Sequence, residues 1–294
     1  LSKIVIMFTQ KDIDQIHSQE LNAKDVENQL ENFKKGFPFL NINRPATIGD
    51  GILKLSEDEV KAYIKLYDGL NPDCIKFVPA SGAASRMFKF LFEFYQKAKD
   101  QYNSLDEISD NEVRKFFEQI KKFAFYSDLK LVMASNKKDL ELLLGQGKYK
   151  EILSYFLFEK GLNYGEKPKG VLSFHQYDGF SRTAFEEHLY EGAFYAKQSD
   201  RKVHIHFTIS PEHEQLFQEL ITEKKMQIEK ALEVEFHITF SQQKPSTDMV
   251  AVDLDNNLFR NNDASLLFRP GGHGALIENL NELESEVIFI KNID

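Results

Sequence analysis

Two segments of the 294-residue sequence combine small residues with residues that can bind an anion. The first runs through Phe77-Val78-Pro79-Ala80-Ser81-Gly82-Ala83-Ala84-Ser85 to Arg86 and Lys89. The second is Phe268-Arg269-Pro270-Gly271-Gly272-His273-Gly274. Each has the pattern of a strand, a tight turn and a helix. Because Gly, Ala and Ser do not block the backbone, its N–H groups can approach a phosphate at such turns.

The two cations of the first segment, Arg86 and Lys89, can neutralise phosphate charge. The loop is not a Walker A loop, because the final Gly-Lys-Ser/Thr is missing. It also lacks the Gly-x-Gly-x-x-Gly spacing of a dinucleotide-binding fold. A tight turn with a surface Arg and Lys is the plainer interpretation. The presence of two such turns in one chain favours a nucleotide site.

The composition limits the classes of function. Hydrophobic residues make up 42% of the chain, which is enough for a full core. The net charge of −9 argues against a nucleic-acid-binding surface, which usually needs a basic face. No apolar run approaches the roughly 18 residues of a membrane span. Cys74 is the only cysteine, so no disulfide forms within the chain and a cytoplasmic location is expected.

The order of elements predicts a helical N-terminal extension over residues 1–70 and an α/β domain over 71–294. Thr9, Asn22 and Ser56 are expected to cap helices of the extension. In the α/β domain, apolar and alternating patterns predict strands that alternate with helices, which favours a mostly parallel sheet. The expected strands are 75–78, 203–209, 235–240 and 287–290. The expected helices include 113–160, a helix capped by Ser181 or Thr183, and 212–231.

The last apolar run, Val287-Ile288-Phe289-Ile290, is typical of a buried central strand. Ligands of open α/β sheets bind outside the carboxyl ends of the strands. A strand end that bears a ligand would be an unusual terminus. We therefore expect the protein to continue beyond Asp294.

The first loop resembles a known signature. Ser81-Gly82-Ala83-Ala84-Ser85-Arg86-Met87 is similar to the loop of sugar-phosphate nucleotidyltransferases, usually Gly-Gly-x-Gly-Thr-Arg-Leu/Met. Arg86 is retained, while Ala84 replaces the third glycine and Ser85 the threonine. Lys167-Pro168-Lys169-Gly170 resembles the Pro-Lys segment of these enzymes, whose lysine contacts phosphate.

Three later segments extend the resemblance to UDP-sugar pyrophosphorylases. The stretch Phe240-Ser241-Gln242-Gln243 resembles their Phe-x-Gln segment, in which a glutamine reads the uracil edge; either glutamine could take that role. Pro270-Gly271-Gly272-His273-Gly274 resembles a segment whose backbone lies against the base and ribose. Ile290-Lys291-Asn292-Ile293-Asp294 resembles a strand end whose aspartate holds Mg²⁺. An uncharacterised bacterial family related to these pyrophosphorylases is the nearest resemblance.

The resemblance implies a three-layer α/β/α, Rossmann-like nucleotidyltransferase with a mixed, mostly parallel sheet. It would join a nucleoside triphosphate, expected to be UTP, to a sugar 1-phosphate and release pyrophosphate. The implied catalytic cations are Arg86, Lys89 and Lys169, and Asp294 would hold Mg²⁺. The implied nucleotide-binding residues are Ser81, Gly82, Ala83, Ser85, Gln242, Gly271, Gly272 and His273.

Two alternatives stay open. A non-catalytic nucleotide or nucleotide-sugar binder would also explain the altered first loop. A metal-dependent hydrolase could be built on His204, His206 and His213, of which the first two share one strand face. No carboxylate or cysteine completes that set, so a partly solvated strand face is favoured. The acids and histidine of residues 182–188 fit a helix N-terminus, with substrate contact as a weaker option.

Overall fold

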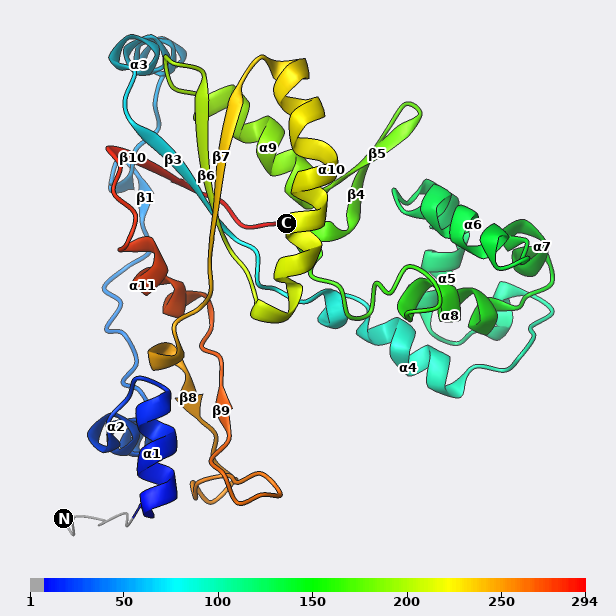
Figure 1. Cartoon of the computed structure of the whole chain (residues 1–294), viewed down its shortest axis with the longest axis horizontal. Coiled ribbons are helices and arrows are strands. Elements are labelled where there is room, and N and C mark those ends of the chain that lie inside the picture. Colours follow the sequence, from blue (N-terminus) through cyan, green and yellow to red (C-terminus); the bar gives the residue numbers. More distant parts are fainter. Residues whose placement is uncertain (1–7) are drawn as a thin grey trace. The chain divides into compact units, whose positions relative to one another are not determined.

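The computed structural model describes residues 8–294, which divide into two compact units (Figure 1). The sheet unit comprises residues 73–242 and 285–294, and the terminal unit comprises residues 8–72 and 243–284. Residues 1–7 of the predicted extension lie outside the described residues. Residues 243–284, predicted within the α/β domain, group with the N-terminal helices, because they share a small hydrophobic core with them.

The sheet unit is built on a four-stranded parallel sheet with the strand order β10-β3-β6-β7. This confirms an α/β body with a parallel sheet. Since all four strands are parallel, their carboxyl ends lie at one edge, where ligands of open α/β sheets bind. In chain order the strands are β3 (Cys74–Pro79), β6 (Lys202–Thr208), β7 (Glu235–Ser241) and β10 (Val287–Ile290).

Two helices pack on one face of this sheet, α9 (Ala184–Tyr195) and α10 (Glu214–Leu232). Alternate strand residues point to opposite faces, so Val203, Ile205 and Phe207 all meet these helices. Helix α9 begins with a capping box at Thr183, one of the two predicted caps. The third layer of the predicted sandwich stays a prediction.

The prediction that β10 is a central strand is wrong. Among residues 8–294 it pairs with β3 alone and so forms one edge of the sheet, and Ile290 is 59% exposed. A continuous apolar run indicates contacts on both faces of a strand. It carries no information on how many strands flank it, which depends on pairing between distant residues.

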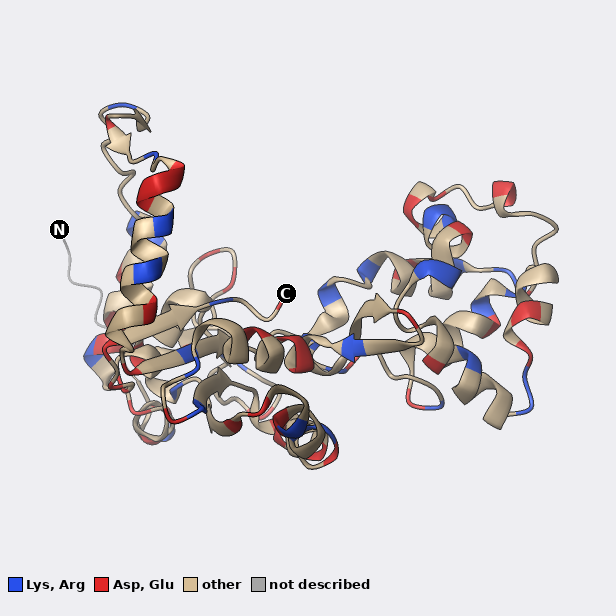
Figure 2. Ribbon diagram, turned by 90° about the horizontal axis from the view of Figure 1, so that it is seen from above, with Lys and Arg blue, Asp and Glu red and all other residues tan. Residues whose placement is uncertain are grey.

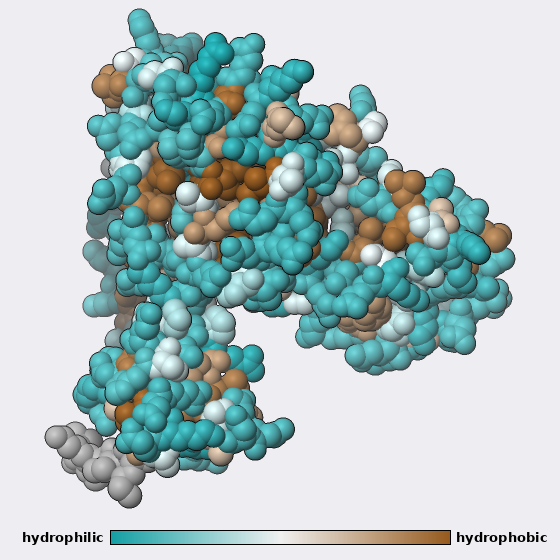
Figure 3. Space-filling view, in the orientation of Figure 1, coloured by the Kyte–Doolittle hydropathy of each residue, from teal (hydrophilic) through white to brown (hydrophobic). Residues whose placement is uncertain are grey.

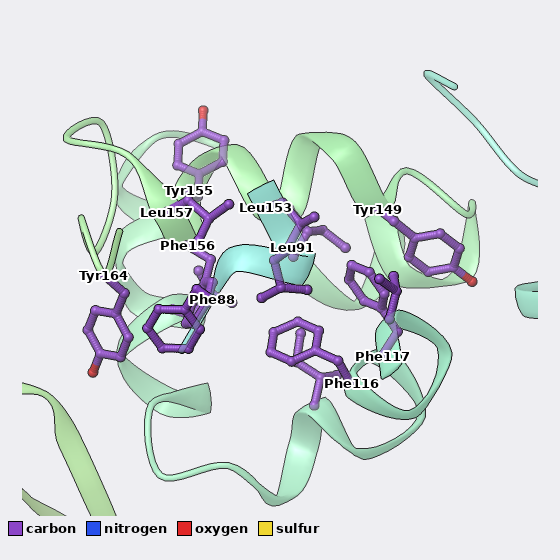
Figure 4. Close-up of a cluster of buried hydrophobic side chains, with 14 of the residues drawn as sticks. Phe88, Leu91, Phe116, Phe117, Tyr149, Leu153, Tyr155, Phe156, Leu157 and Tyr164 are labelled. Carbon is purple, nitrogen blue, oxygen red and sulfur yellow. The ribbon is translucent and has the colours of Figure 1, made fainter. Parts of the chain in front are cut away.

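A helical part joins β3 to the rest of the sheet unit, and its core is rich in phenylalanine (Figure 4). Phe156 is fully buried and its ring lies 4.6 Å from that of Phe125 and 5.0 Å from that of Phe88. Its helices are α4 (Lys89–Lys97), α5 (Asn111–Gln119), α6 (Tyr126–Ser135), α7 (Leu140–Gly145) and α8 (Tyr149–Leu157). The last four confirm the helical prediction for residues 113–160. An antiparallel hairpin, β4 (Ser173–Tyr177) and β5 (Phe180–Thr183), leads to α9.

The terminal unit holds short elements around a small core. All three predicted caps are confirmed, because Thr9, Asn22 and Ser56 each form a capping box. The core is formed by buried residues of the first two helices with Val250 and Leu266. The elements are α1 (Gln10–Ser18), α2 (Ala23–Lys35), β1 (Thr47–Ile48), β2 (Gly51–Ile52), α3 (Glu57–Leu70), β8 (Met249–Val250), β9 (Phe268–Arg269) and α11 (Ile277–Leu280).

Polar contacts hold the 243–284 segment to α1 and α2. Arg260 donates two hydrogen bonds to the buried carboxylate of Asp12, at 2.7 and 3.0 Å. The amide of Gln15 both donates to and accepts from the backbone of Leu266, as a neighbouring strand would. These contacts satisfy the backbone of the segment without a larger sheet.

Among helices of residues 8–294, none has the length and apolar character needed to cross a membrane. The single cysteine, Cys74, is buried at the start of β3 and forms no disulfide.

Candidate functional site

The first predicted loop lies at the carboxyl edge of the sheet and is tied to the loop after β6. The N–H of Ala80 donates to the carbonyl of Thr208 at 2.8 Å. The hydroxyl of Ser210 donates to the carbonyl of Ser81 at 3.2 Å. The loop then continues through a 3-10 turn, Ala84–Arg86, into α4. This is the predicted strand, small-residue turn and helix.

The predicted Pro-Lys segment crosses the same loop. The N–H of Ala84 donates to the carbonyl of Lys167 at 3.2 Å, and the N–H of Lys169 donates to the carbonyl of Gly82 at 3.1 Å. A backbone bridge links Ala83 and Pro168 between these bonds. The two segments are more than 80 residues apart in sequence, yet they form one piece of irregular backbone.

Gly82 is not required by the packing of the protein itself. A Cβ atom added there would meet no atom within 4 Å, and its φ is not in the left-handed region. The neighbouring Ala84 is fully buried, so its methyl group packs into the core of the helical part instead of facing solvent. The extra methyl relative to the signature loop is therefore accounted for, and open space lies beside Gly82 where a ligand's phosphate could approach.

Asp294 lies beside this loop, because its carboxylate pairs with the ammonium of Lys169. The two side chains, predicted separately as metal ligand and phosphate contact, are partners 125 residues apart in sequence. Asp294 keeps 35% of its side chain exposed. Mg²⁺ usually takes one or two protein carboxylates and completes its shell with water and phosphate oxygens. An accessible carboxylate next to a loop of small residues fits that ion.

The residue before Asp294 anchors the end of β10. Backbone hydrogen bonding to β3 continues one residue past the end of β10, where the N–H of Lys291 donates to the carbonyl of Phe77 at 3.1 Å. Ile293 is buried in the core beneath α9 and α10. The Nε2 atom of His188 lies 3.3 Å from the carbonyl of Ile293. Burial lowers the pKa of His188 to about 4, so this imidazole is neutral at pH 7.

A charged network lies behind this anchor. Lys76 of β3 is fully buried, and its ammonium donates to a Glu191 carboxylate oxygen at 2.9 Å and to the carbonyl of His188 at 3.1 Å. Lys291 pairs with the other oxygen of Glu191. Burial lowers the pKa of Lys76 to about 8. Burial alone would raise the pKa of Glu191, but hydrogen bonds from Lys291 and Lys76 outweigh it and hold that pKa at about 2.

The remaining predicted cations, Arg86 and Lys89, line an open groove of about 620 Å³ between α4 and α5. The ammonium of Lys89 lies 3.6 Å from Glu93 and is largely exposed. Within residues 8–294, Arg86 makes no ion pair. Ser85, like Arg86, is exposed on the 3-10 turn.

The other predicted nucleotide-binding residues divide between the units. Gln242 belongs to the sheet unit, where its amide donates to Glu214 at 3.3 Å. Gly271, Gly272 and His273 belong to the terminal unit. Gly272 resembles Gly82 in that an added Cβ would meet no atom within 4 Å. The convergence of the two small-residue loops on one pocket stays a prediction.

The second glutamine, Gln243, lies near Gly271, since a Cβ added at that glycine would be 3.6 Å from its Nε2 atom. It also donates to Asp248 at 3.3 Å. Both neighbours belong to the same unit as the Gly-Gly-His-Gly segment. Gln243 is therefore the better candidate of the two for a role together with that segment.

The histidines of the hydrolase alternative do not form a metal cluster. Within residues 8–294, no group of three or more His, Cys, Asp or Glu residues could hold a metal ion. The two nitrogens of His206 lie 2.8 Å from the hydroxyls of Thr239 and Ser241. The ring of His204 stacks on that of His237 on the neighbouring strand. His213 lies 3.2 Å from the carbonyl of Glu166.

The sequence interpretation missed the residues that hold Asp294 in place. Lys76 lies in the middle of an apolar strand, and a charge in such a run is the signal of a buried partner. Its partner Glu191 lies in α9, a helix with several acidic residues, which gives no sign of which one turns inward. His188 was noted only as part of a helix N-terminus.

The comparisons with known proteins identify a family but no activity. No curated protein and no solved structure matches the chain. Residues 9–294 match the family described as a domain of unknown function (DUF4301), and the chain belongs to that family.

Proposed function

We propose that this protein is a Mg²⁺-dependent nucleotidyltransferase of the three-layer Rossmann-like type. It would transfer a nucleotidyl group, in the first instance from UTP, to a sugar 1-phosphate. The contact between Lys169 and Asp294 beside Gly82 carries the proposal. These three positions come from separate segments that the motif resemblance links to phosphate and metal binding, and the fold brings them to one sheet edge.

In this reaction the bonds that form and break belong to the two substrates and not to the protein. An oxygen of the acceptor phosphate attacks the α-phosphorus of the triphosphate, the new P–O bond forms, and pyrophosphate leaves with the electrons of the broken bond. Positioning and charge neutralisation dominate such a step. Mg²⁺ held by Asp294 would neutralise phosphate charge when bound. Lys169 and Arg86 would contact phosphate oxygens, and the N–H groups around Gly82 would receive them at close range.

Pyrophosphate release tests the reaction. The protein should release pyrophosphate from UTP in the presence of Mg²⁺ and one member of a panel of sugar 1-phosphates. Asp294→Asn should abolish turnover and leave the fold intact. Mg²⁺-dependent activity that is indifferent to Asp294→Asn would overturn the metal assignment.

Substitution of the open glycine tests the site without relying on turnover. Gly82→Ala should leave the free energy of unfolding unchanged or raise it slightly, since nothing in the protein fills that space. It should weaken UTP binding, because the new methyl group occupies the path of the phosphate. Gly145→Ala, at a second uncrowded glycine away from the loop, is the matched control. Binding of UTP without any turnover would favour the non-catalytic binder instead.

A further inference from the structure

The groove beside Arg86 continues into an apolar pocket. The groove has a volume of about 620 Å³ and the pocket a volume of about 280 Å³. Both lie in the helical part of the sheet unit. Met87, Phe90, Phe116 and Phe123 line both, so the two cavities adjoin along a common wall. We name them the cationic groove and the phenylalanine pocket.

The cationic groove is set up for an anion. Arg86, Lys89 and Lys115 line it together with Glu93 and Glu112, so its walls carry a net charge of +1 in a chain whose net charge is −9. Within residues 8–294, neither Arg86 nor Lys115 makes an ion pair. Figure 2 shows acidic and basic residues interspersed along the ribbon of the helical part.

The two acids of the groove offset only part of this positive charge. Glu93 lies 3.6 Å from the ammonium of Lys89, which precedes it by four residues on the same helix. Glu112 lies in the first turn of α5, where the helix dipole stabilises a carboxylate. Arg86 and Lys115 therefore face the groove without an ion-pair partner among residues 8–294, within walls whose net charge is +1. A phosphate monoester has three acceptor oxygens and can take hydrogen bonds from both cations at once.

The phenylalanine pocket offers almost no hydrogen bonds. Its walls include Phe88, Phe125, Phe174 and Leu172. Of its two polar side chains, Ser173 donates its hydroxyl to Asp128 at 2.7 Å, and the Tyr164 hydroxyl accepts from the N–H of Ser173 at 3.0 Å. Figure 3 shows hydrophobic side chains reaching the surface among hydrophilic ones on the helical part.

The chemistry of this pocket excludes the parts of a nucleotide sugar. A sugar ring or a nucleobase edge buried there would leave its polar groups without partners, which costs about 1–3 kcal/mol for each group. An aliphatic chain or a plain aromatic ring loses nothing in such a pocket and gains from burial. The volume corresponds to about nine water molecules at about 30 Å³ each. That is space for a chain of medium length.

We propose that the cationic groove and the phenylalanine pocket together bind a soluble phosphate monoester with an apolar body. The phosphate lies between Arg86 and Lys115, and the apolar group fills the pocket. This function goes beyond the proposed nucleotidyl transfer and does not depend on it. The occupant lies next to the small-residue loop, because Arg86 belongs to both.

Calorimetric titration with decyl phosphate tests the proposal, with inorganic phosphate and decanol as the two half-ligands. Decyl phosphate should bind at least about tenfold more tightly than either half. Ala124→Leu places a larger apolar side chain in the wall of the pocket and should weaken decyl phosphate binding by about tenfold or more. Ala134→Leu, at an exposed position of α6, is its control.

A surface variant keeps the test independent of core packing. Lys115→Gln should weaken decyl phosphate binding by about fivefold or more, while Lys130→Gln, exposed on α6, should not. Ala124→Leu should leave UTP binding unchanged, because the phenylalanine pocket is not part of the proposed nucleotide site and the two sites share only Arg86. Decyl phosphate that binds no more tightly than phosphate alone, or that is insensitive to both Ala124→Leu and Lys115→Gln, would overturn the proposal.

Discussion

Glu191→Gln should destabilise the sheet unit in a way that depends on pH. The substitution removes the carboxylate that pairs with the fully buried Lys76. The pKa of Lys76 is about 8 in the folded protein and ordinarily about 10.5. Burial of the protonated form thus costs about 3 kcal/mol below pH 8, and this cost disappears as the pH rises towards 10.5.

Without Glu191 the pKa of Lys76 falls further, since that carboxylate raises it. The extra cost has an upper limit, because Lys76 loses its proton once the buried charged form becomes less favourable than the neutral form. At pH 7 a neutral Lys76 costs about 5 kcal/mol relative to the unfolded chain, so the variant loses at most about 1–2 kcal/mol through this residue. The limit grows to about 3 kcal/mol at pH 6 and vanishes well above pH 8. His188, with a pKa of about 4, stays neutral over this range.

Urea unfolding at pH 6, 7 and 9, followed by circular dichroism, measures this trend. Lys76→Met provides the control background, because it removes the buried charge and leaves Glu191 paired with Lys291 at the rim. In that background Glu191→Gln should cost less than about 1 kcal/mol at every pH. A loss that is independent of pH, or equal in the two backgrounds, would refute the reasoning.

Three other predictions concern stability. Arg260→Gln should cost the terminal unit about 1–3 kcal/mol and Asp12→Asn less, because only the first leaves a buried carboxylate without its cation, with Thr9 as its remaining donor. The hydrogen bond from Arg260 is the main cause that holds the pKa of Asp12 well below its ordinary value. The stabilisation from this pair is therefore present above about pH 4 and is lost as the pH falls, which unfolding measured over an acid pH series would detect. Gly147→Ala should destabilise by more than about 1 kcal/mol in urea unfolding, since its φ is +68° and an added Cβ would lie 1.9 Å from a backbone oxygen, whereas Gly145→Ala should not. Phe156→Ala should cost about 3–5 kcal/mol by the same measurement, and a loss below about 1 kcal/mol would contradict its place in the core of the helical part.

The features that the sequence predicts well are local. The capping boxes at Thr9, Asn22, Ser56 and Thr183 form between residues three apart, so their pattern is complete in a short window. The alternation of residues 203–209 is equally local, because a strand with one face on helices repeats every two residues. Such elements need no knowledge of their distant partners.

The features that the sequence does not predict depend on distant partners. Nothing local places β10 at an edge, because that depends on which strands pair across the whole unit. Nothing local joins Lys76 to Glu191, which are 115 residues apart. The resemblance places Lys169 and Asp294 in one kind of site, but it does not predict that the two side chains pair with each other. Similarly, the choice of Gln243 over Gln242 required the position of Gly271.

Binding of UTP with Mg²⁺ to the variants Arg86→Gln and Lys169→Gln tests the central claim most directly. Calorimetry should show saturable binding to the unaltered protein. Each substitution should weaken that binding by about 1.5–3 kcal/mol, or roughly 10- to 150-fold, the scale of a hydrogen bond to a charged group. Lys130→Gln should leave it unchanged. Absence of UTP binding, or equal affinity in the unaltered protein and both variants, would contradict a phosphate site at this edge of the sheet.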